Sequence, residues 1–106
     1  DVHYILSKKK WKTVVTHNPD GEYGHIHHQM TSYIVRKDSR VDMNQLVYFG
    51  KYYRKKNMPA HLASISSSDL EKKMKLTGMY SSQAKVMDHL GHMLPHENWV
   101  KAKDWR

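Results

Sequence analysis

Three histidines stand within four residues, and their spacing could place metal ligands side by side. His25, His27 and His28 follow two glycines, Gly21 and Gly24. Neutral imidazole is the commonest metal-binding side chain in proteins, and zinc is one of its usual partners. Residues three apart share one face of a helix, so His25 and His28 would converge on one small object if a helix starts here. The glycines allow left-handed backbone angles and a close approach to a ligand.

The same pattern has a plainer interpretation, which stays open at this point. A His-x-x-His pair on its own is more often a surface feature than a site, and only the loop before it favours a site. A catalytic zinc ion usually takes three protein ligands and a water molecule. His27 is expected to point to a different side of the helix from His25 and His28. We therefore expect the other ligands to come from outside this segment.

A strand, a glycine-bearing loop and a helix are predicted to position these histidines. Residues 11–16 form a short β-branched run that is typical of a buried strand, and residues 17–21 are turn formers. Apolar residues at helical spacing predict a helix over residues 25–37. This order is half of a βαβ unit and indicates the α/β fold class. Ligands of open α/β sheets bind beyond the carboxyl ends of the strands, which is where this loop would lie.

The remaining segments predict shorter elements. Residues 2–6 are typical of the last turns of a helix that ends at the basic run of residues 8–10, and residues 46–52 and 62–66 are strand candidates. Ser68 and Glu71 have the capping-box spacing, which predicts that a helix starts there. A second or bent helix is expected after Gly78, and residues 96–106 are interpreted as a poorly specified tail that docks on the core.

The composition limits the classes of protein that fit. The 106 residues suffice for one small domain, and the lack of cysteine excludes disulfides, thiol nucleophiles and Cys-ligated zinc. No apolar run approaches the roughly 18 residues of a membrane span, and no signal-peptide pattern is present. The formal charge of +8 raises the case for nucleic acid or anionic lipid. However, the cations lie in short scattered clusters, which favours an ordinary solvated surface.

Two blocks of the sequence resemble the LmbE/PIG-L family of zinc-dependent de-N-acetylases. The first runs from Trp11 through Thr-His-Asn-Pro to Gly-Glu-Tyr-Gly-His-x-x-His, and it is similar to the second conserved block of that family. The second, Lys75 followed by Tyr80-Ser81-Ser82-Gln83, is similar to a later family helix. The match spans residues 11–83. The resemblance implies that His28 is a zinc ligand, and that His25 faces the substrate carbonyl and steadies the oxyanion.

Two departures from the family pattern affect this interpretation. His27 stands where many members have Asp or Asn, which changes local hydrogen bonding but removes no ligand. The family's first block, Ala-His-Pro-Asp-Asp-Glu, occurs nowhere in the chain. In the family that block supplies a His and an Asp to the zinc, together with the Asp that acts as general base. We therefore expect residues 1–106 to be the C-terminal portion of a single de-N-acetylase domain with a Rossmann-like fold, containing half of an active site.

The function that this resemblance implies is amide hydrolysis of an N-acetylglucosamine-type conjugate with Zn²⁺ as cofactor. The isolated chain is expected to be inactive and the full protein cytoplasmic, without a membrane span in this chain and without a nucleic-acid partner. Two alternatives stay open: a small basic module that binds nucleic acid or anionic lipid, and a degenerate remnant without activity. The sequence names neither the sugar conjugate nor the oligomeric state.

Overall fold

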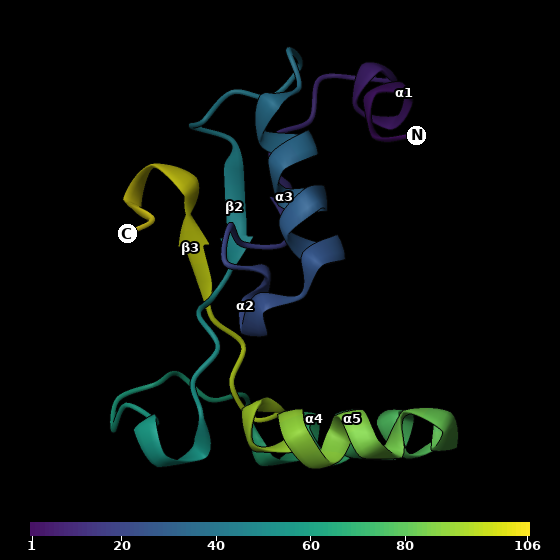
Figure 1. Cartoon of the computed structure of the whole chain (residues 1–106), viewed down its shortest axis with the longest axis vertical. Coiled ribbons are helices and arrows are strands. Elements are labelled where there is room, and N and C mark those ends of the chain that lie inside the picture. The colour runs from purple at the N-terminus through teal and green to yellow at the C-terminus, as the bar shows by residue number, and fades with distance from the viewer. The chain divides into compact units, whose positions relative to one another are not determined.

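The computed structural model describes all residues from 1 to 106 and divides them into two compact units. Residues 1–52 and 99–106 form the first, which we call the sheet unit; residues 53–98 form the second, the helical unit. The chain is mixed α/β, with five α-helices and a single three-stranded sheet (Figure 1). The α/β class predicted from the sequence is confirmed at this level.

The sheet contains one parallel and one antiparallel strand pair. Its strands are β1 (Val14–Thr16), β2 (Leu46–Phe49) and β3 (Trp99–Lys101), in the order β1-β2-β3. β1 pairs in parallel with β2, and β2 pairs antiparallel with β3. The predicted strands over residues 11–16 and 46–52 are thus confirmed, although both are shorter than expected. The tail over residues 96–106 is more ordered than predicted, because it supplies β3.

Three helices complete the sheet unit (Figure 1). α1 (Val2–Ser7) begins at Asp1, whose carboxylate accepts a hydrogen bond from the backbone N–H of Tyr4 at 2.9 Å. α2 (Gly21–Gly24) is a short turn inside the loop after β1, and α3 (Ile26–Lys37) connects that loop to β2. The predicted order of strand, loop and helix is confirmed, with α1 ending just before the basic run as expected.

A small core lies on one face of this sheet. Its buried members are Val35 from α3, Leu46 and Tyr48 from β2, and Ala102 from the short 3₁₀ turn Ala102–Asp104. The Trp105 ring packs edge-on against Tyr48, with ring centroids 5.7 Å apart. The segment after β3, which was predicted to dock on the core, therefore contributes Ala102 to the core itself.

The other face of the sheet has partly exposed apolar side chains within the sheet unit. Side chains alternate along a strand, so the register groups Val15, Phe49 and Trp99 opposite the core. Their exposed fractions are 39%, 39% and 56%. Sheets with parallel strands are normally covered on both faces. The sheet unit thus presents an apolar surface of the kind that packs against further protein.

The apolar stripe that predicted α3 also faces outward. Ile26, Met30, Tyr33 and Ile34 recur at helical spacing, and each is about half exposed or more. The residues of α3 that face the core are Ser32 and Val35. The periodicity correctly predicted the helix, but it marks the side of the helix that points away from the core.

The helical unit contains α4 (Ser67–Gly78), α5 (Ala84–Leu90) and three 3₁₀ turns, Lys55–Asn57, Ser81–Gln83 and Gly91–Met93. The predicted break after Gly78 and the second helix are confirmed. None of its residues is fully buried. Polar contacts connect its segments: Lys73 Nζ donates to the Leu94 carbonyl at 2.9 Å and pairs with the Glu97 carboxylate at 3.0 Å. No helix in the chain has the length and apolar character needed to cross a membrane.

Two predictions for this unit are wrong. Residues 62–66 form no strand, because Ser66 already serves as the N-cap of α4 and its hydroxyl accepts a hydrogen bond from the Asp69 N–H at 3.2 Å. The N-cap consequently lies two residues before the predicted cap at Ser68. Several serines in succession offer alternative caps, and Ser66, whose backbone is still extended (φ −61°, ψ 156°), takes that position.

Burial raises the pKa of the Tyr48 phenol above its ordinary value of 10.0, and this predicts alkaline destabilisation. Below pH 10 the phenol is neutral in both states, and its stabilising contribution is fully present. As the pH rises further, the unfolded chain loses its proton first, so that contribution is lost. We expect Tyr48→Phe to lose less stability between pH 8 and 11 than the unchanged protein, measured by urea unfolding. Tyr33→Phe, at an exposed position, is the control; equal losses in all three proteins would contradict the prediction.

Candidate metal centre

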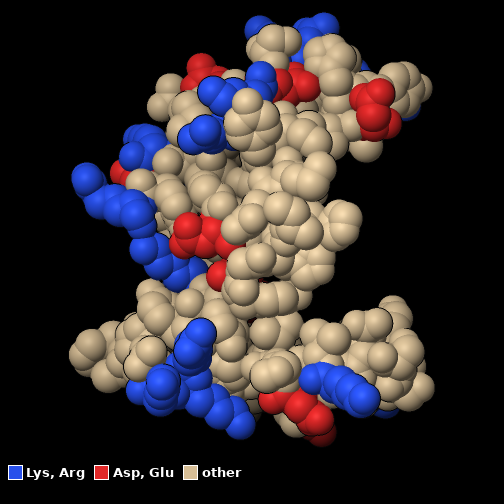
Figure 2. Space-filling model, viewed as in Figure 1, with Lys and Arg blue, Asp and Glu red and all other residues tan.

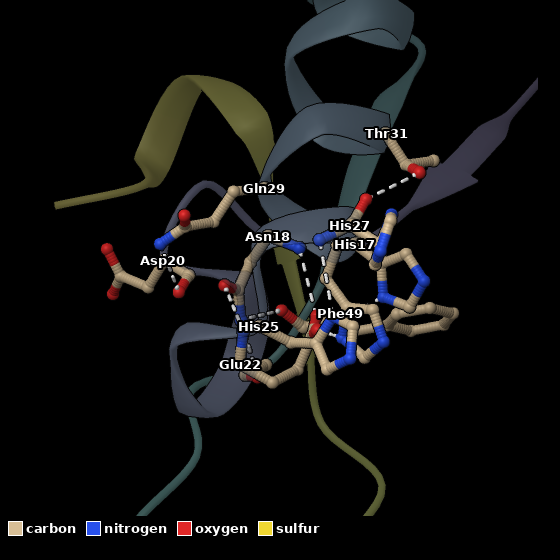
Figure 3. Close-up of polar contacts among 11 residues, drawn as sticks. His17, Asn18, Asp20, Glu22, His25, His27, Gln29, Thr31 and Phe49 are labelled. Atoms are coloured by element: carbon tan, nitrogen blue, oxygen red, sulfur yellow. Dashed lines mark hydrogen bonds and ion pairs between the residues drawn. The ribbon is translucent and has the colours of Figure 1, made fainter.

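The loop after β1 folds back on itself and brings the histidines together (Figure 3). It leaves the sheet at buried Thr16 and passes through left-handed backbone angles at Gly21 (φ 67°), Glu22 (φ 57°) and Gly24 (φ 91°). It then enters α3, with His25 as the N-cap. The left-handed angles predicted for the two glycines are confirmed, while Glu22 adopts a conformation that usually costs a non-glycine residue about 1–3 kcal/mol.

Asn18 ties this loop to the neighbouring strand (Figure 3). Its side chain is fully buried, and its amide nitrogen donates to the carbonyls of Phe49 at 3.2 Å and Gly50 at 3.1 Å, where β2 ends. Its amide oxygen accepts a hydrogen bond from the backbone N–H of Glu22 at 3.0 Å. The side chain thus fixes the position of Glu22 relative to the carboxyl ends of both parallel strands.

The Glu22 carboxylate is the polar centre of the loop. One oxygen, Oε1, accepts a hydrogen bond from the Asn18 N–H at 3.1 Å. The other, Oε2, contacts Nδ1 of His17 at 3.1 Å and Nδ1 of His28 at 2.6 Å. The side chain of Glu22 is only 18% exposed, so these contacts are partly shielded from water. Two imidazoles from different ends of the loop therefore meet on one carboxylate oxygen.

The imidazole rings form a stacked group. His28 lies parallel to His17 within 8°, with ring centroids 3.9 Å apart, and it also stacks on His25 at 4.5 Å. The expectation that His25 and His28 share one face agrees with this arrangement. His27 is exposed, and its ring is tilted by 41° relative to His25. The backbone N–H of His27 donates to Nδ1 of His25 at 3.2 Å, which completes the cap of α3.

His17, Glu22 and His28 together could hold a metal ion. Each offers one ligand atom, and these atoms lie within 4.8 Å of one another. The structure brings His17 and Glu22 to His28 from within the segment; that further ligands come from outside it stays a prediction. Residues of an irregular loop do not recur at a helix or strand period, so the sequence does not show that His17, Glu22 and His28 come together. The available signal was a histidine directly after a strand, followed by glycines that let the chain return.

Aromatic side chains border the group. The Phe49 ring meets His17 edge-on at 5.5 Å, and the Tyr23 ring meets His28 at 5.7 Å and Tyr52 at 6.0 Å. His17 and His28 keep side-chain exposures of 32% and 26%. The site is thus half-open, with one carboxylate, stacked imidazoles and aromatic walls.

Positive charge does not concentrate at one place on the face shown in Figure 2, where Lys and Arg lie in several separate patches with Asp and Glu among them. This distribution matches the scattered clusters in the sequence. On the visible face of each unit, the Lys and Arg side chains do not form one continuous cationic track of the kind that follows a nucleic-acid backbone.

Comparison with known proteins shows a similarity to a viral protein. The chain is 28% identical over 100 residues to "Uncharacterized protein L374" of Acanthamoeba polyphaga mimivirus, an alignment that covers 94% of this chain and 39% of that protein. The chain therefore spans about two fifths of the length of this relative. No family model matches the chain, and no solved structure matches it.

The bonds of Asn18 predict that its loss is costly. Asn18→Ala leaves two strand-end carbonyls and the Glu22 N–H without their partner, so we expect a loss of about 2–4 kcal/mol in the free energy of unfolding, measured by urea titration. Asn44→Ala is the matched control, because Asn44 is exposed and lies outside the site; we expect it to change stability by less than about 0.5 kcal/mol. Similar values for the two variants would show that the Asn18 bonds contribute little.

Proposed function

We propose that this chain is part of a zinc-dependent hydrolase of the LmbE/PIG-L type, which removes acetyl from an N-acetylated amino-sugar conjugate. The proposal rests on the motif resemblance over residues 11–83 and on the local arrangement of its first block. The succession of β1, α3 and a parallel β2 supports the Rossmann-like fold that the resemblance implies. The length of the mimiviral relative is compatible with a protein of which this chain is one part.

The observation that carries the proposal is the pairing of His25 and His28. Their rings stack at 4.5 Å at the start of α3, on the loop that follows the carboxyl end of β1. Open α/β sheets bind ligands at this edge. A metal-dependent hydrolase that acts on an amide needs a metal ligand and an oxyanion donor close together, and this pair could supply both kinds of group.

The hydrogen bond of His25 supports its role as the donor. Nδ1 of His25 accepts the His27 N–H at 3.2 Å, so a neutral ring carries its proton on Nε2. An N–H at this position can donate to a carbonyl oxygen, and more strongly to the oxyanion that forms from it. His25 therefore has a donor directed away from its own backbone contact, as the proposed role requires.

The imidazole of His28 fits zinc, because imidazole nitrogen is one of the ligand atoms that zinc takes in proteins. When bound, zinc lowers the pKa of a bound water to about 7 and polarises the acetyl carbonyl. His28 would hold the metal and His25 would steady the oxyanion, while Tyr23 and Phe49 shield the imidazoles on their flanks. The general base and two further ligands would come from the block that this chain lacks.

Variants of the two histidines separate their roles in a protein that carries the missing block. We expect His28→Ala to lose most of its zinc after dialysis, and His25→Ala to keep zinc but lose about 100- to 1000-fold in turnover. His27→Ala is the control and should keep zinc, since the exposed His27 ring lies outside the metal-binding group. Equal zinc loss from His25→Ala and His28→Ala, measured by metal analysis, would refute the assignment.

The isolated chain of residues 1–106 is expected to have no deacetylase activity and to hold zinc only weakly. Structural and catalytic zinc sites need three or four well-placed ligands, and this loop offers few. The uncovered side chains of Val15, Phe49 and Trp99 should also promote aggregation. Zinc content after dialysis, turnover and cooperative unfolding are the measurements. Stoichiometric zinc together with turnover would show that the chain contains a whole site.

A further inference from the structure

The contact between Glu22 and His28 has the length of a hydrogen bond and is too short for two ligands of one ion. A tetrahedral zinc with bonds of about 2.0–2.1 Å keeps its ligand atoms roughly 3.3 Å apart. Nδ1 of His28 and Oε2 of Glu22 are 2.6 Å apart. Charge-assisted hydrogen bonds have lengths close to this. In this arrangement a proton on Nδ1 joins the two groups, and the metal-binding nitrogen of His28 is Nε2.

We propose that Glu22 is the positioning residue of the metal centre: it fixes His28 in the Nδ1–H form and thereby presents the Nε2 lone pair to the metal. This inference rests on the proposed function, because it assigns a partner to the ligand named there. An ionised carboxylate can only accept hydrogen bonds, so its Oε2 requires a proton on the nitrogen that it contacts. Metal-binding histidines generally donate their second N–H to such an acceptor, which fixes both tautomer and ring orientation.

His17 belongs to the same support and is not a second ligand of the same ion in this geometry. Its ring lies 3.9 Å from that of His28 and within 8° of parallel. A ring nitrogen binds metal through a lone pair in the ring plane, and an ion in the plane of the His28 ring lies well outside the plane of the parallel His17 ring. A hydrogen bond to one oxygen tolerates more deviation from the ring plane than a metal bond does. His17 donates to the same Oε2 at 3.1 Å and covers one side of His28. It therefore restricts rotation of the His28 ring.

The backbone around Glu22 supports a function for this side chain. Glu22 has φ 57° and ψ −88°, a conformation that glycine adopts far more easily. The buried Asn18 holds it there by bonds to both its backbone N–H and its carboxylate. Strain of this kind persists where the surroundings impose it, and it is commonest at functional sites. The loop thus keeps a carboxylate in a conformation that the chain alone would not choose.

The hydrogen bond of His25 differs from that of His28. Its Nδ1 accepts a backbone N–H from His27, whereas Nδ1 of His28 donates to a carboxylate. The two rings therefore carry their protons on opposite nitrogens, although they lie three residues apart and stack. One presents an N–H and the other a lone pair from Nε2. Glu22 controls only the second of these.

The test compares Glu22→Gln with the unchanged residue in the longest form of the protein that carries this chain. Co²⁺ serves as the metal probe, because its visible absorption reports its ligands. Asp20→Asn is the matched control, since Asp20 is an exposed carboxylate in the same loop that contacts no imidazole. We expect Glu22→Gln to weaken Co²⁺ binding about 10- to 100-fold with an unchanged absorption spectrum. We expect Asp20→Asn to bind as the unchanged protein does.

A second measurement needs no metal. Long-range ¹H–¹⁵N spectra with labelled histidine, recorded at pH 8, show which ring nitrogen carries the proton. We expect His28 to change from Nδ1–H to mostly Nε2–H in Glu22→Gln, while His25 stays Nε2–H. A changed Co²⁺ spectrum would overturn the proposal by showing that Glu22 is itself a ligand. Unchanged affinity and an unchanged His28 tautomer would also overturn it, since Glu22 would then be merely structural. If no form binds Co²⁺, the zinc role fails, and the tautomer of His28 still decides the inference.

Discussion

The buried side chain of Asn18 is the contact on which the candidate site depends. Asn18 lies two residues after the end of β1, and its side chain connects the loop to the carbonyls at the end of β2. These hydrogen bonds join the loop to the end of β2, and the ring contacts of His17 with Phe49 and of Tyr23 with Tyr52 add to them. The bonds that Asn18 accepts and donates then place Glu22, and Glu22 places two imidazoles. The geometry of the site is therefore inherited from the pairing of β1 with β2.

Local patterns predicted the elements of the sheet unit well and their long-range partners poorly. The β-branched run before residue 17 and the helical spacing after residue 25 depend on neighbours in sequence, and both predictions are confirmed. The pairing of Asn18 with the end of β2 joins residues more than 30 apart, and no local signal encodes it. The same is true of β3, whose Trp99 pairs with Phe49 although the intervening chain forms another unit. Residues 96–106 were predicted to be a poorly specified tail because the strand that β3 pairs with, β2, is distant in the sequence.

The candidate site was predicted in part for the same reason. His25 and His28 lie on one helix start, so their spacing alone predicted that they meet. His17 and Glu22 reach His28 only because the backbone reverses at residues 21 and 22 with positive φ angles. Glutamate is seldom found at such angles, and a sequence-based interpretation therefore places its side chain elsewhere. The motif resemblance concerns this same segment, whereas the hydrogen bonds that organise it are visible only in the folded chain.

The insertion of the helical unit between β2 and β3 has a consequence for how the sheet unit forms. Tyr48 is buried partly by Trp105 and belongs to the same core as Ala102, yet both of these follow the whole helical unit in sequence. The core therefore depends on contacts of high sequence separation, whose loop-closure entropy must be offset before they stabilise anything. Chains with such topology fold slowly relative to helical bundles of the same size. During synthesis on the ribosome, Tyr48 would stay partly exposed after β1, α3 and β2 have emerged, until β3 and the turn after it follow.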